Sequence, residues 1–137
     1  MDARSLSPLL LRVALAAMWL SHALLKILVF TLPGAAAFFE SKGIPGVLVY
    51  PVVAAEIAGG VAILFGVYAR QVALLLVPIL AVALWTHVPN GWVFTNAGGG
   101  WEYPLFLIVL AAVVALQAVP GTARENVNAA DAQLKAA

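Results

Sequence analysis

The stretch from residue 9 to residue 30, LLLRVALAAMWLSHALLKILVF, limits most strictly what this chain can fold into. It is long and apolar enough to cross a bilayer as a helix, yet it contains Arg12, His22 and Lys26. At about 100° per residue, these three side chains fall within roughly 80° of one helix face. Because a cation in hydrocarbon costs about 3 kcal/mol on insertion scales, this face must meet protein or water. The rest of the chain therefore has to supply acidic or hydrogen-bond-accepting partners.

The composition is that of an all-α integral membrane protein whose main partner is the lipid bilayer. Of the 137 residues, 64% are hydrophobic and only 9% are charged, whereas a soluble domain carries about 25% charged residues. The net charge of +1, without a basic run, argues against nucleic-acid binding. The absence of cysteine excludes disulfides, thiol nucleophiles and Cys-ligated clusters.

The apolar segments predict one transmembrane domain, residues 1–121, folded as a four-helix bundle, and a polar tail, residues 122–137. Proline and glycine separate the segments, which are expected as helices at about residues 8–31, 46–68, 71–88 and 102–119. Residues 34–45 are too short and too mixed to span, so we expect a short interfacial helix there that ends at Gly43.

The distribution of basic residues predicts the orientation of these four spans. Four spans bring both termini to the same side, and that side carries most of the basic residues: Arg4, Arg70, Arg124 and Lys135. The two loops on the opposite side contain one basic residue, Lys42. The positive-inside rule therefore predicts a multi-pass protein of the inner (plasma) membrane with cytoplasmic termini.

The polar residues of the spans sort into three layers when depth is taken from a rise of about 1.5 Å per residue. The outer layer holds Lys26, His87 and Glu102, the midplane His22 and Glu56, and the inner layer Arg12 and Gln117. We expect Lys26, His22, Glu56 and Glu102 to form one network that lines an outward-opening cleft, with His87 near it. Glu56 is interpreted either as a structural anchor for a basic partner or as a proton or ligand site.

Small residues follow the acidic face of the second expected span and indicate close helix packing. Ala58, Ala62 and Gly66 recur every four residues and predict a small-xxx-small ridge. Gly59 and Gly60 lie within about 60° of Glu56 on the same helix.

The sequence offers no set of catalytic or metal-ligating residues. The two aspartates, Asp2 and Asp131, are terminal, so no Ser/His/Asp triad can be assembled, and the catalytic residues stay unassigned. His22 and His87 differ by about 8 Å in depth, which argues against a haem held by both. Without a neighbouring acid cluster, the two histidines also predict no metal site.

The motifs in their order resemble the DoxX family of small four-helix membrane proteins. The resemblance rests on Arg12, on SHALLK at 21–26, on FFESKGIPG at 38–46, on AEIAGGVAILFGVYAR at 55–70 and on GGWEYPLFLIVLA at 99–111. It departs at Ala23, where the family often has glycine. The family takes its name from a subunit associated with a terminal quinol oxidase and thiosulfate:quinone oxidoreductase. The resemblance thus implies a membrane subunit near quinone and redox chemistry, not a catalytic chain.

Three functional hypotheses follow. The first is a quinone-interacting or accessory subunit of a membrane redox system, with a quinone as candidate ligand and a redox enzyme as partner. The second is a small proton-coupled transporter or channel that uses Glu56 and must act as a homo-oligomer, because four helices rarely enclose a path. The third is a structural or assembly partner without an activity of its own.

Overall fold

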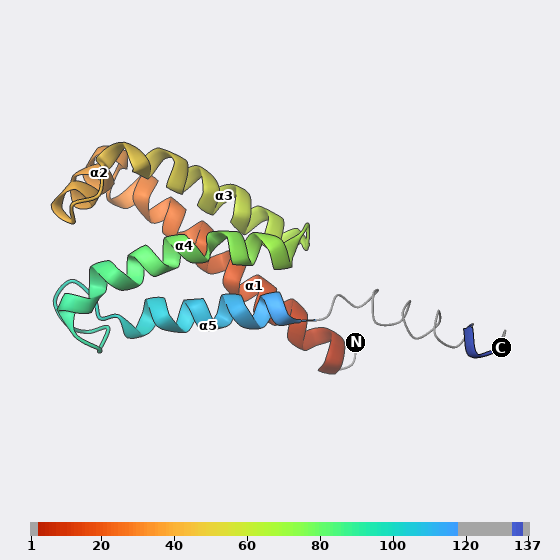
Figure 1. The fold of residues 1–137 in the computed structure, drawn as a ribbon. Coiled ribbons are helices and arrows are strands. Elements are labelled where there is room, and N and C mark those ends of the chain that lie inside the picture. Colours follow the sequence, from red (N-terminus) through yellow and green to blue (C-terminus); the bar gives the residue numbers. More distant parts are fainter. Residues whose placement is uncertain (1–2, 118–132, 136–137) are drawn as a thin grey trace.

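The computed structural model describes residues 3–117 and 133–135, and the elements within them are helical, with no strand (Figure 1). In chain order they are α1 (Ala3–Leu24), η1 (Leu25–Val29), α2 (Leu32–Ser41), η2 (Gly46–Leu48), α3 (Val49–Phe65), α4 (Ala69–His87), η3 (Val88–Asn90) and α5 (Glu102–Leu116). The expected tail boundary, and the end of the last expected span at residue 119, lie outside the described residues.

Three helical segments of the described residues are long and apolar enough to cross a membrane: Leu6–Val29, Gly46–Phe65 and Ala69–Asn90. The fourth apolar helix, α5, has 15 residues and is therefore about 22 Å long, less than a hydrocarbon core of about 30 Å. It ends because Gln117 adopts an extended conformation, with ψ of 126°. The all-helical, membrane-spanning character expected from composition is thus present in the fold.

The helix ends differ from the expected ones at several places. The first helix begins at Ala3 rather than near residue 8, so Pro8 lies inside it. The second long helix ends at Phe65, not at residue 68, because Gly66 takes a left-handed conformation with φ of 76° and closes the helix. The short helix starts at Leu32, where Thr31 caps it by accepting a hydrogen bond from the N–H of Gly34, and it ends at Ser41 rather than at Gly43.

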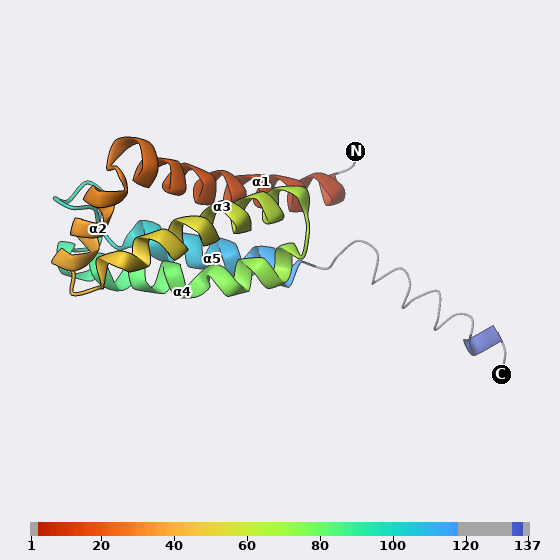
Figure 2. The ribbon, with the colours of Figure 1, turned by 90° about the horizontal axis from the view of Figure 1, so that it is seen from above.

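The four long helices share one core, and α2 covers one end of it. Leu15, Trp19, Ile63, Leu76 and Leu107 pack together from all four of α1, α3, α4 and α5. A second cluster, which contains Ala23, Ala35, Val49 and Val53, lies beneath α2. Figures 1 and 2 show α2 and the 91–101 loop at the same end of the bundle, opposite the start of α1. The segment α2 and that loop therefore cover the polar residues at this end of the bundle.

Two adjacent glycines let α3 approach its neighbours on both sides. A Cβ added at Gly59 would lie 2.5 Å from Cδ1 of Leu76 on α4, and one at Gly60 would lie 2.9 Å from Cγ of Leu20 on α1. The expected ridge is only partly a packing surface: Ala58 is exposed, Ala62 is half-buried, and Gly66 serves as the cap of α3. The ridge expectation fails at Ala58 because the two buried glycines, and not the four-residue repeat, face the other helices.

Replacing either glycine by leucine should destabilise the bundle. Gly59→Leu and Gly60→Leu should each lower the free energy of unfolding by about 1–3 kcal/mol, because the added side chain overlaps a packed neighbour. The matched control is Ala58→Leu, which lies on the exposed face and should change stability by less than about 0.5 kcal/mol. Unfolding in detergent, followed by circular dichroism, measures all three; equal losses would contradict the packing assignment.

Candidate functional site

An ion pair between α3 and the end of the first helix forms the centre of the candidate site. Nζ of Lys26 donates to Oε1 of Glu56 at 2.8 Å and to Oε2 at 3.0 Å. The Glu56 side chain is 3% exposed and the Lys26 side chain 18% exposed, so the pair is largely removed from solvent. Nζ also lies 3.5 Å from the carbonyl oxygen of His22, a much weaker contact. The acidic partner expected for the basic face of the first helix is therefore Glu56.

Lys26 sits in an irregular part of its helix. Residues 25–29 form a π-helix, in which hydrogen bonds join residues i and i+5. Such helices occur mostly as single turns within α-helices and are frequent at functional sites. The N–H of Phe30 accordingly donates to the carbonyl of Leu25 at 2.9 Å. Lys26, which contacts Glu56 of α3, therefore lies within this π-helical turn.

Both histidines use the same ring nitrogen to bond their own helix. Nδ1 of His22 lies 2.9 Å from the carbonyl oxygen of Met18, and Nδ1 of His87 lies 2.6 Å from that of Ala83. A carbonyl oxygen only accepts, so Nδ1 carries the proton in both rings. When such a ring is neutral, its Nε2 has a free lone pair and acts as an acceptor.

These groups line one large cavity. Its volume is about 1020 Å³, and its polar side chains are His22, Lys26, Glu56, Thr86, His87 and Tyr103. The remaining walls are mainly aliphatic and aromatic, with Phe38 and Phe39 of α2 above and glycines 98–100 of the loop beside them. Four of the five expected site residues therefore meet here: His22, Lys26, Glu56 and His87.

Glu102 does not join them. Its Oε1 accepts a hydrogen bond of 2.8 Å from the backbone N–H of Phe94, and it lines a separate, smaller cavity on the other side of α5. The expected four-residue network is thus reduced to the Lys26–Glu56 pair with His22 beside it. Glu102 instead ties the 91–101 loop to the start of α5.

Three cavity residues were not among the expected site residues. The ring of Tyr103 stacks on His22, with centroids 6.0 Å apart and an interplanar angle of 21°. The hydroxyl of Thr86 donates to the carbonyl of Ala83 at 2.9 Å and lies 3.2 Å from Nδ1 of His87. Trp19 is buried and lines the cavity, and its indole Nε1 has no hydrogen-bond partner among the described residues. The sequence contains only weak signals for these residues. Tyr103 and Thr86 are next to an expected site residue, and Trp19 lies on the polar face of the first helix.

The expected inner layer is a looser arrangement. Arg12 is half-buried and packs against the C-terminal cap of α3, where a Cβ at Gly66 would lie 2.6 Å from its Nη1. A cation there is favourable, because the last carbonyl groups of a helix carry partial negative charge. Gln117 caps α5 through its backbone, and no hydrogen bond joins it to Arg12 within residues 3–117.

Metal-binding geometry is not found in the part of the chain that the structure describes: no group of three or more His, Cys, Asp or Glu side chains converges there. His22 and His87 share the cavity but offer two nitrogen ligands only. The polar side chains that line the cavity offer hydrogen bonds and one compensated ion pair.

Breaking the ion pair should cost more than removing it. Glu56→Gln and Lys26→Met should each lower the free energy of unfolding by about 3 kcal/mol, because each leaves a charge buried without its partner. The double variant should lose less than the sum, with a coupling of at least about 1 kcal/mol. Lys42→Met is the control, since Lys42 lies over the ring of Phe38 at the surface. Strictly additive losses in a denaturant titration would show that the two side chains are independent.

The comparisons with known proteins agree with the resemblance seen in the motifs. The family model described as DoxX matches residues 7–89, which is more than half of the chain and includes most of α1 and all of α2, α3 and α4. No curated protein and no solved structure matches the chain. The matched segment contains His22, Lys26, Glu56 and His87, whereas α5 with Glu102 follows it. The chain therefore belongs to the DoxX family.

Proposed function

We propose that this chain is an accessory subunit of a membrane redox system and that its large cavity binds the head of a quinone. Support comes from the family, which takes its name from a subunit near quinol and thiosulfate:quinone chemistry. The observation that carries the proposal is the convergence of Lys26, Glu56, His22 and His87 on one apolar cavity of about 1020 Å³. Ligand cavities typically have apolar walls and a few convergent polar groups.

The polar groups suit both oxidation states of such a head. A quinone carbonyl accepts hydrogen bonds, and Lys26 has one donor engaged only in the 3.5 Å contact with the His22 carbonyl, which a ligand oxygen could replace. A hydroquinone hydroxyl donates, and Nε2 of His22 and of His87 can accept from it, because Nδ1 of each ring is used by the backbone. Since Lys26 and Glu56 compensate each other, the cavity favours an uncharged ligand.

The buried indole of Trp19 is consistent with this fit. A buried donor without a partner costs about 1–3 kcal/mol, and Trp19 Nε1 is such a donor in the wall of the cavity. A ligand oxygen that reached it after a small movement of the indole would recover that cost. When bound, the quinone would supply the electron-accepting chemistry, while the side chains of this chain bind and orient it.

Removing one histidine acceptor should weaken the binding of a hydroquinone about tenfold. We expect this for His22→Phe and for His87→Phe, because each loses one buried hydrogen bond of about 1.4 kcal/mol while an aromatic ring remains. Binding of a short-chain hydroquinone to the purified protein, measured by calorimetry, gives the dissociation constants. Trp85→Phe, at an exposed position of α4, is the control. If neither quinone nor hydroquinone binds, or raises the melting temperature, the cavity is not a quinone site.

We also propose four spans in the inner (plasma) membrane, with both termini in the cytoplasm. The start of α1, the turn between α3 and α4, and the end of α5 lie at one end of the bundle, whereas α2 and the 91–101 loop lie at the other (Figures 1 and 2). Arg70 belongs to the first end and Lys42 to the second. The excess of basic residues at the first end supports a cytoplasmic assignment. As a span, α5 requires local thinning of the bilayer or extension beyond Leu116.

Labelling from outside tests this topology directly, because the chain has no cysteine of its own. Single cysteines at Lys42 and at Asn96 should react with a membrane-impermeant maleimide in intact cells. A cysteine at Arg70 should react only after the cells are opened. The reverse labelling pattern would show that the orientation is opposite to the proposed one. Labelling of all three cysteines in intact cells would show that α3 and α4 do not span the membrane.

A further inference from the structure

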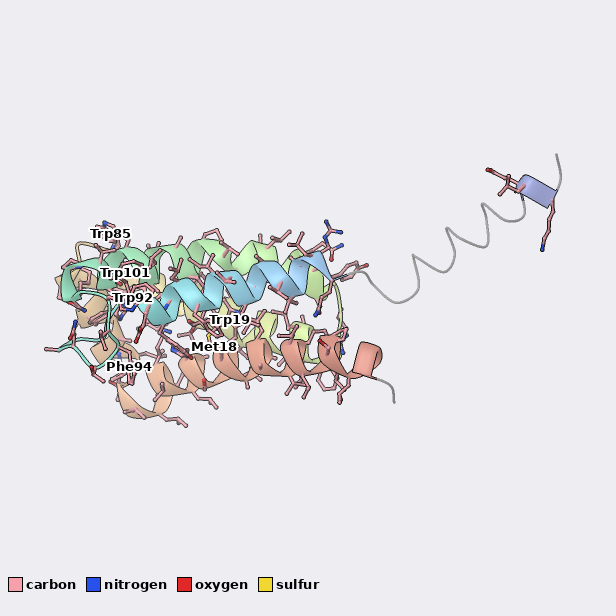
Figure 3. The ribbon with its side chains drawn as sticks, turned by 90° about the horizontal axis from the view of Figure 1, so that it is seen from below. Met18, Trp19, Trp85, Trp92, Phe94 and Trp101 are labelled. Atoms are coloured by element: carbon pink, nitrogen blue, oxygen red, sulfur yellow. The ribbon has the colours of Figure 1, made fainter. Side chains whose placement is uncertain are left out.

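A second cavity, separate from the proposed quinone site, lies along the outer side of α5. Its volume is about 470 Å³, and we call it the α5 groove; it is lined by Trp92, Phe94, Glu102, Tyr103, Leu105, Phe106 and Val109. Figure 3 shows Trp92 and Phe94 in the loop at the end of the bundle where α5 begins. The groove is half-open, and it combines four aromatic side chains with a single carboxylate.

The carboxylate of Glu102 has no cationic partner among residues 3–117. Within residues 3–117 the only ion pair joins Lys26 to Glu56, so Glu102 has no cationic side chain beside it there and is stabilised only by the N–H of Phe94 and by the N-terminal end of α5. Oε1 is held by the N–H of Phe94, and this bond fixes the carboxylate at the upper end of the groove. Oε2 has no hydrogen-bond partner in the same residues. A cationic ligand would complete this site, whereas an anionic one would be repelled.

The aromatic lining narrows the kind of cation. Trp92, Phe94, Tyr103 and Phe106 line the groove, and the face of an aromatic ring can attract an organic ammonium group through its quadrupole. One face of Tyr103 is already stacked on His22. The groove then continues from Glu102 to Val109, seven residues and therefore about 10 Å along α5. Phe106 and Val109 are exposed on the surface of the bundle, where they would meet lipid if α5 spans the membrane as proposed. One end of the groove thus attracts a cation, and the rest is an apolar surface that follows α5 and could hold an acyl chain.

We propose that the α5 groove binds a phospholipid with an ammonium headgroup, drawn from the leaflet that adjoins the 91–101 loop. The ammonium lies against Glu102 and the loop aromatics, and one acyl chain runs along Phe106 and Val109. The bound lipid also supports the proposed cavity, because Phe94 and Tyr103 line both spaces. The site does not depend on a quinone, so it can be tested separately from the proposed function.

Native mass spectrometry of the protein released from lipid nanodiscs tests the headgroup preference. The nanodiscs contain equal amounts of phosphatidylethanolamine, phosphatidylcholine and phosphatidylglycerol. The first two lipids carry an ammonium group, and we expect each to be retained about fivefold more than phosphatidylglycerol, the size of one partly exposed ion pair. Glu102→Gln keeps the acceptor for Phe94 and removes the charge, so it should bring this ratio close to one.

Two further variants separate the groove from general effects. Glu40→Gln, an exposed acidic residue on α2 outside the groove, should leave the ratio unchanged. Phe106→Ala should lower the retention of all three lipids alike, since it shortens the apolar run without touching the charge. An unchanged ratio in Glu102→Gln, a preference for phosphatidylglycerol, or a dimer that buries α5 and retains no lipid would overturn the proposal. If Glu102→Gln fails to fold, equal retention of the three lipids by the parent protein would overturn it by itself.

Discussion

The Lys26–Glu56 ion pair is the contact that gives this bundle its arrangement. Either charge alone would cost several kcal/mol within an apolar bundle, so the two helices that carry them must stay together. Gly60 makes this contact possible from the side of α3, because its lack of a side chain admits Leu20 and Trp19 of α1. On the other side of the contact, Lys26 lies in the π-helical turn that follows α1. Charge pairing and glycine packing therefore reinforce each other in the same pair of helices.

The direction of the side chains explains which polar residues meet. In a helix the Cα–Cβ bond leans toward the N-terminus. The first helix and α3 run in opposite directions, so Lys26 leans back into the bundle while Glu56 leans toward the end at which Lys26 lies (Figure 1). Their depths along the two helices differ by about 7–9 Å, and the lean of both side chains together with the length of lysine closes that gap. The sequence placed both residues in one expected network but did not identify which basic residue pairs with Glu56.

The same rule explains why the prediction that Glu102 joins the network of Lys26, His22 and Glu56 was wrong. Glu102 has nearly the same depth as Lys26, but it stands at the N-terminus of α5 and leans out of the bundle, toward the 91–101 loop. Depth was a usable guide for residues that lean inward, such as His87 near the C-terminal end of α4. It could not reveal the side of the helix, because the hydrogen bond from Phe94 to Glu102 depends on a loop whose path follows from tertiary contacts. The exposed Ala58 shows the same limit of sequence analysis for helix packing. A repeat of small residues every four positions does not reveal which helix, if any, packs against that face.

The division of charge between the two cavities determines what each can hold. In the larger cavity the one acid and the one amine neutralise each other, so its net requirement is for hydrogen bonds rather than for a counter-ion. In the α5 groove the carboxylate of Glu102 has no such partner within the described residues. The two proposals therefore assign an uncharged ligand to the larger cavity and an ammonium group to the α5 groove, although Phe94 and Tyr103 line both spaces. Because Tyr103 also stacks on His22, a ligand bound in the groove as proposed would lie against a ring that contacts a cavity histidine.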